Sequence, residues 1–330
     1  MYISRGVVMI EIQRITDYLS EHITDPVPKY IFQREILKAP VTSPDYLNAY
    51  HIMRQSKWYS DLADEQWEDG SWGRFHSQDS KAPTKLKFAT TEHALKRSLQ
   101  LSLSKDDPII AKCIKLMEQY VRGEETWRDN IEKHHDGGRS HLHSRSYFTA
   151  AWVNLFDPKN PVVKPKRDVF INTLNKALSK GYFDEEAWLE ENRNYRGPCL
   201  NGWNAYPLMI LQNSNCLDDA LQRRYLSYIW NRKDGIYYLA NFPLSKKISL
   251  EDKRFYLWIY TLEFLTGFSL FPEFMKDEAL PHLLSETYRL IDEDVVIPPT
   301  YNLRYANSWR DKNNRKTDLV LRLARLLKKC

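Results

Sequence analysis

The sequence contains no run of eighteen consecutive apolar residues, which is the length that spans a bilayer as a helix. Its first fifteen residues have no long apolar segment followed by a small-residue cleavage site, as a signal peptide would. The four cysteines include no C-x-x-C pair and no Cys/His spacing of the zinc-binding type. We therefore expect a protein without an integral membrane segment, and cysteines kept reduced in the cytoplasm.

Several motifs that would define a function are also missing. There is no P-loop, no G-x-G-x-x-G, no G-x-S-x-G and no H-E-x-x-H, which speaks against nucleotide-dependent enzymes, serine hydrolases and zinc proteases. The formal net charge is +5, and the basic residues are spread along the chain, so no nucleic-acid partner is expected. No Ser/Gly-rich linker divides the 330 residues. We predict one domain over 1–330, with 1–9 as a disordered or non-native start because the first helical pattern follows Met9.

Helical periodicity dominates the remaining sequence. Apolar residues recur at helical spacing over 10–23 and 44–66. Helix-start signals, such as Asp107 followed by Pro108, separate the later segments. No segment reads as a convincing strand. The pattern predicts an all-α protein of roughly a dozen helices.

The stretch 58–76 joins the end of one predicted helix to an aromatic-rich turn. Gln66, Gly70 and Trp72 form the pattern Q-x-x-x-G-x-W. Glycine accepts the backbone conformation of a tight turn. The Gln side chain can bond to backbone groups at the start of the next helix, and the indole can close the corner.

This pattern resembles the QW motif of the squalene cyclase and protein prenyltransferase superfamily, including bacterial cyclase-like members of unassigned activity. Weaker echoes of the corner lie at Trp127 and at Tyr237 and Tyr238. The resemblance implies a single-domain α/α toroid, a ring of inner and outer helices built from helix pairs. It also implies a terpenoid cyclase-like or prenyltransferase-like protein that holds a small isoprenoid ligand in an aromatic-lined cavity.

The chain departs from this superfamily at the catalytic motifs. It has no D-x-D-D, no D-D-x-x-D and no D-x-C zinc motif. Whether the protein is an enzyme is therefore open, and no metal site or cofactor is expected; Mg²⁺ would be needed only if a diphosphate were the substrate.

A His- and Gly-rich segment, residues 134–143, is the densest group of titratable side chains. Histidine can act as an acid, a base or a metal ligand near neutral pH. A solvated surface turn is the alternative interpretation. The catalytic candidates in and beside this segment are His135, Asp136, His141 and His143, with Arg139 and Arg145 as substrate-binding candidates.

Further candidates lie near predicted helix starts. His76 and Glu92 are the other catalytic candidates, because His76 follows the QW-type corner and Glu92 opens a helix. Packing at a corner or a solvated first turn is the alternative for each. The remaining cavity-lining candidates are Trp72, Arg74, His93, Trp203, Asn204, Tyr206, Trp258 and Trp309.

Three functions remain open on the sequence. The first is an isoprenoid enzyme. The second is a carbohydrate-active lyase or glycoside hydrolase on a similar toroid, with aromatic platforms and a His/Tyr/Arg or paired-carboxylate centre. The third is a non-catalytic binding or scaffold protein. The oligomeric state is not predicted.

Overall fold

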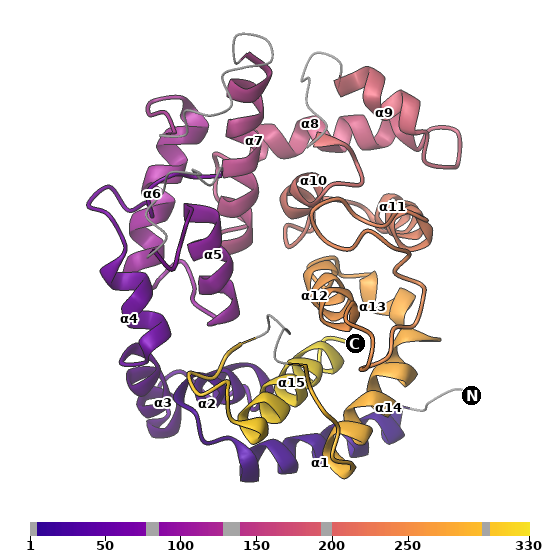
Figure 1. Ribbon diagram of the computed structural model, residues 1–330. Coiled ribbons are helices and arrows are strands. Elements are labelled where there is room, and N and C mark those ends of the chain that lie inside the picture. Colours follow the sequence, from indigo (N-terminus) through magenta and orange to yellow (C-terminus); the bar gives the residue numbers. More distant parts are fainter. Residues whose placement is uncertain (1–4, 77–85, 128–138, 193–199, 299–303) are drawn as a thin grey trace. The chain divides into compact units, whose positions relative to one another are not determined.

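The computed structural model describes residues 5–76, 86–127, 139–192, 200–298 and 304–330, and of 5–11 and 139–142 only the backbone. Across these ranges the chain is all-α, as the sequence predicts, with α-helices and one π-helix (Figure 1). The only β-structure in the described residues is an isolated bridge between Asn204 and Tyr237. Within the same ranges, no helix has both the length and the apolar character needed to cross a membrane.

The chain divides into two compact units, each discontinuous in sequence. Unit 1 comprises Met1–Ser60, Leu244–Thr266 and Phe271–Cys330, and unit 2 comprises Asp61–Pro243 and Gly267–Leu270. Helix α4 (Lys57–Asp64) runs from the first into the second. The prediction of a single domain stays a prediction.

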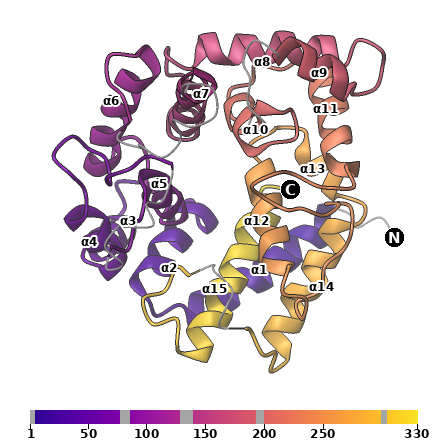
Figure 2. The ribbon, with the colours of Figure 1, turned by 45° about the horizontal axis from the view of Figure 1, so that its top comes forward.

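Unit 1 is built around its C-terminal helix. Helix α15 packs against α1, α12 and α14 (Figures 1 and 2). The leucines at 319, 323, 326 and 327 are buried, so the apolar face of this basic helix lies in the core of the unit. The helices of unit 1 are α1 (Arg5–His22), α2 (Pro26–Ile31), η1 (Phe32–Ile36), α3 (Pro44–Arg54), α12 (Phe255–Leu265), α13 (Phe271–Met275), α14 (Ala279–Asp292) and α15 (Lys312–Leu327).

Unit 2 consists of packed helix pairs. Helix α7 packs against α6 and α10, and α8 packs against α9 and α10 (Figures 1 and 2). The helices of this unit are α5 (Thr91–Gln100), α6 (Pro108–Arg122), α7 (Arg139–Phe156), α8 (Lys164–Ala177), α9 (Glu185–Glu191), α10 (Ala205–Leu211) and α11 (Asp219–Asn231).

Local signals set most of the helix ends. Thr90 caps α5 by accepting a hydrogen bond from the His93 amide at 3.2 Å. Pro108 occupies the first turn of α6, and Gly123 ends that helix with a φ of 76°. The prediction of one helix over 44–66 is wrong, because α3 ends at Arg54 and Ser56 starts α4 by accepting from the Tyr59 amide.

The corner at Gln66 joins α4 to α6. The Gln66 side-chain amide donates to the carbonyl of Gly70 at 3.0 Å and to the carbonyl of Ile109, in the first turn of α6, at 2.7 Å. The Trp72 indole donates to the carbonyl of Leu62 at 2.8 Å. The Gln side chain therefore bonds backbone at a helix start, as its position suggested, but at the start of α6 and not of α5, the next helix in the chain.

Candidate functional site

The segment after this corner is held against the start of α5. The Thr91 amide donates to the carbonyl of Arg74 at 2.7 Å, and the Glu92 amide donates to the carbonyl of Phe75 at 3.1 Å. These two backbone bonds bring His76 beside the first turn of α5. Two catalytic candidates that are separate in the sequence therefore become neighbours.

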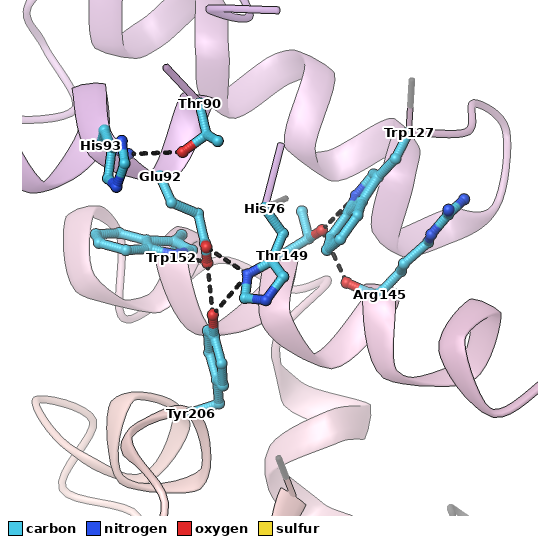
Figure 3. A network of polar contacts seen from close by, with 9 residues as sticks. All are labelled: His76, Thr90, Glu92, His93, Trp127, Arg145, Thr149, Trp152 and Tyr206. Atoms are coloured by element: carbon cyan, nitrogen blue, oxygen red, sulfur yellow. Dashed lines mark hydrogen bonds and ion pairs between the residues drawn. The ribbon is translucent and has the colours of Figure 1, made fainter. Parts of the chain in front are cut away.

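The carboxylate of Glu92 is the centre of a polar cluster (Figure 3). Nδ1 of His76 lies 2.6 Å from Oε2. Oε1 accepts from the Tyr206 hydroxyl at 2.9 Å and from the Trp152 indole N–H at 2.5 Å. Both side chains of the His76–Glu92 pair are largely buried, with 17% and 12% exposed. We call these four residues the Glu92 cluster.

The contact with an ionised Glu92 favours one tautomer of His76. A carboxylate is only an acceptor, so Nδ1 carries the proton that points to Glu92. In the neutral imidazole the lone pair then belongs to Nε2. The tautomer is the one that a carboxylate imposes on catalytic and metal-binding histidines.

Tyr206 reaches the cluster from α10. Asn204 is fully buried and caps this helix by accepting from the Tyr206 amide at 3.1 Å. The phenol ring stacks on Phe148 of α7 at a centroid distance of 4.1 Å. Its hydroxyl oxygen lies 3.1 Å from Nδ1 of His76, so both carboxylate and phenol face the same imidazole nitrogen.

Aromatic rings surround His76. Its centroid lies 5.3 Å from that of Phe148 and 6.3 Å from those of Trp127 and Tyr238. The Trp127 indole is fixed by a hydrogen bond to Thr149 at 3.1 Å. Burial among rings strengthens the His76–Glu92 attraction, because the local dielectric is lower than that of water.

The other candidates from residues 134–145 have different surroundings. His135 and Asp136 lie outside the described residues, and Arg139 and His141 are described only as backbone of α7. His143 packs against the ring of Tyr147 at 5.1 Å, and burial, with a contribution from Lys166, lowers its pKa.

Four cavity-lining candidates of unit 2 lie close to the Glu92 cluster in sequence or space. Trp72 and Arg74 belong to the corner that precedes His76. Arg145 lies over the Trp127 ring at 5.3 Å. His93 adjoins Glu92 on α5, and burial lowers its pKa more than the Glu92 charge raises it.

The remaining candidates pack elsewhere. Trp203 lies under the guanidinium of Arg232 at 4.9 Å. Trp258 and Trp309 are buried residues of unit 1, and Trp258 donates to the carbonyl of Leu244 at 3.0 Å.

Trp152 and Phe148 were missed as site residues. They are four residues apart on α7, so they share one helix face. Arg145 lies on the same face three residues earlier. The helical spacing of these three residues is visible in the sequence, but their position beside Glu92 is not.

Over the described ranges, no group of three or more His, Cys, Asp or Glu residues is arranged to hold a metal ion. Comparisons with protein-family models, with curated proteins and with solved structures return no match. The functional proposal below therefore rests on the geometry of the Glu92 cluster.

Proposed function

We propose that the Glu92 cluster is the general acid–base centre of an enzyme, with His76 as the group that exchanges a proton with the substrate. The observation that carries this proposal is the 2.6 Å contact between Nδ1 of His76 and Oε2 of Glu92 in a largely buried, aromatic environment. A carboxylate on one imidazole nitrogen orients the ring, makes the other nitrogen a better base and stabilises the imidazolium that forms.

Glu92 is a positioning residue in this proposal. It accepts hydrogen bonds from His76, Tyr206 and Trp152, so its carboxylate orients the imidazole and is itself held by the phenol and the indole. The acid of a class II cyclase must present an O–H group to an alkene, whereas the contacts with His76, Tyr206 and Trp152 occupy both carboxylate oxygens of Glu92. The cluster therefore supports a base better than it supports that acid.

Elimination is the reaction class that suits this set of groups. Nε2 of His76 takes a proton from a carbon next to a carboxylate or carbonyl, and the C–H electron pair forms a carbon–carbon double bond. The bond from the β carbon to its oxygen substituent breaks, and the leaving oxygen takes the proton back from the imidazolium. Glycoside hydrolysis instead uses a pair of carboxyl groups, and the Glu92 cluster contains one.

An isoprenoid enzyme on an α/α toroid is the second candidate. The rings around His76, which include Phe148 and Trp127, favour it, because aromatic faces stabilise carbocations. The packed helix pairs of unit 2 and the Gln66 corner support the toroid as a proposal for the fold.

A product screen tests the proposal. The full-length protein is incubated with uronate oligosaccharides, β-hydroxy acids, prenyl diphosphates and squalene, with and without Mg²⁺, and the products are identified by mass spectrometry. We expect an unsaturated elimination product that His76→Asn abolishes, while the exposed His51→Asn leaves it unchanged. Turnover that survives His76→Asn would overturn the proposal. An isoprenoid product that depends on His76 would support the second candidate instead.

A further inference from the structure

Two tyrosines next to the Glu92 cluster are unusually exposed. Tyr237 and Tyr238 have 55% and 53% of their surface accessible, and their ring centroids lie 4.4 Å apart. The Tyr238 ring lies 6.3 Å from His76 and 5.9 Å from Tyr206. An exposed aromatic pair therefore adjoins the proton-transfer groups.

The backbone of Tyr238 adopts a conformation that is strained for a tyrosine. Tyr238 has a φ of 69°, in the left-handed region that bulky side chains rarely adopt. Such strain persists where the surrounding structure imposes it, and it concentrates at functional sites.

Three backbone bonds impose the conformation. The Tyr237 amide donates to the carbonyl of Trp203 at 3.0 Å, and the Ala205 amide donates to the carbonyl of Tyr237 at 3.2 Å. The Ile236 amide closes the turn on the carbonyl of Ala240 at 2.7 Å. The first two bonds tie the exposed pair to the start of α10, the helix that supplies Tyr206.

We infer that Tyr238, with the ring of Tyr237 tilted by 57° beside it, forms a stacking platform for a carbohydrate ring, so that the substrate class of the site is an oligosaccharide; this inference rests on the proposed acid–base function. One face of a pyranose presents C–H groups, which are attracted to the electron-rich face of an aromatic ring. Its hydroxyl groups lie at the edge, where the phenol hydroxyls can bond to them. A sugar therefore matches rings that are half exposed and polar at their tips, whereas an isoprenoid chain matches rings enclosed away from water.

Binding measurements separate this inference from the proposed reaction. Full-length protein is titrated calorimetrically with tetrasaccharides of galacturonate, mannuronate, glucose and N-acetylglucosamine. We expect at least one tetrasaccharide to bind. Tyr238→Ala should weaken its binding about tenfold. Tyr238→Phe keeps the ring and should bind with nearly the wild-type affinity. Tyr182→Ala is the matched control, because Tyr182 of unit 2 is also exposed, at 61%. This substitution should leave tetrasaccharide binding unchanged.

His76→Asn distinguishes the two claims. It should retain sugar binding and lose turnover. If Tyr238→Ala weakens binding but His76→Asn leaves turnover intact, the platform stands and the acid–base assignment fails. If none of the four tetrasaccharides binds, or if Tyr238→Ala and Tyr182→Ala bind equally well, the platform is wrong. A His76-dependent turnover of a substrate that is not a sugar would overturn the platform alone.

Discussion

Glu92 and His76 are 16 residues apart in the sequence, and their side chains meet at 2.6 Å. The contact depends on the backbone pairing of residues 74 and 75 with the first turn of α5. The same carboxylate also receives the hydroxyl of Tyr206, 114 residues away. One side chain therefore couples the corner, α5 and α10 within unit 2.

Replacing Glu92 by Gln should destabilise unit 2. In place of Oε1 the amide NH₂ group would face the Trp152 and Tyr206 donors, and in place of Oε2 it would force His76 into the other tautomer. We expect a loss of about 1–3 kcal/mol in the free energy of unfolding, measured by urea denaturation. Glu68→Gln, at an exposed turn, should stay within about 0.5 kcal/mol of wild type. Equal stability of the two variants would show that the donors do not depend on the carboxylate.

Replacing Gln66 by Ala should weaken the corner between α4 and α6. The substitution removes hydrogen bonds to the carbonyls of Gly70 and Ile109, which should cost about 1–2 kcal/mol. Gln55→Ala is a matched control, because the described contact of the Gln55 side chain is with the exposed His51. Thermal unfolding followed by circular dichroism checks both. The corner has no bracing role if Gln66→Ala unfolds at the same temperature as Gln55→Ala.

Two glycines with left-handed backbones should respond very differently to alanine. A Cβ at Gly235 would lie 2.0 Å from the carbonyl oxygen of Ala240, whereas a Cβ at Gly181 has nothing within 4 Å. Gly181→Ala should cost about 1–2 kcal/mol from backbone strain alone. Gly235→Ala should cost about 1–3 kcal/mol more, because backbone must also move. If the two variants had similar chemical denaturation midpoints, the close approach of Gly235 to the carbonyl of Ala240 would be contradicted.

A buried carboxyl in unit 1 should make stability depend on pH. Burial raises the pKa of Asp318 to about 8, although it accepts backbone hydrogen bonds from Tyr305 at 2.8 Å and Ala306 at 3.0 Å. The nearby Asp25 acts in the same direction as burial, and Arg322 opposes it. The folded protein therefore keeps a proton that the unfolded chain releases near the ordinary value of 3.8.

The sign of the effect follows from this difference. Between the two pKa values the folded state binds more protons, so this group's stabilisation is complete at low pH and declines by about 1.4 kcal/mol per pH unit as pH rises toward 8. Asp318→Asn removes the titration, and its amide oxygen can still accept both backbone bonds. Urea denaturation from about pH 5 to about pH 7.5 should show wild type losing stability relative to the variant. Parallel pH profiles would mean that Asp318 is already ionised in the folded state.

Local chemistry determined much of what the sequence could predict. Thr90 and Pro108 mark helix starts and Gly123 marks a helix end, because capping and backbone preference act over a few residues. The Gln66 corner was readable in part: its bond to Gly70 is local, whereas its bond to Ile109 reaches past α5 to α6 and depends on packing. The break at Ser56 was missed, because apolar residues continue on both sides of a serine that caps α4.

Only the tertiary structure decided which candidates act together. The sequence offered His76, Glu92 and Tyr206 separately, and no spacing rule joins His76 to a residue 130 positions away. Trp152 was not recognised, because its indole becomes a donor to Glu92 only when α7 packs beside α5's first turn. Helix ends depend on neighbours in the chain, whereas the cluster depends on long-range packing of helices, which a local pattern does not encode.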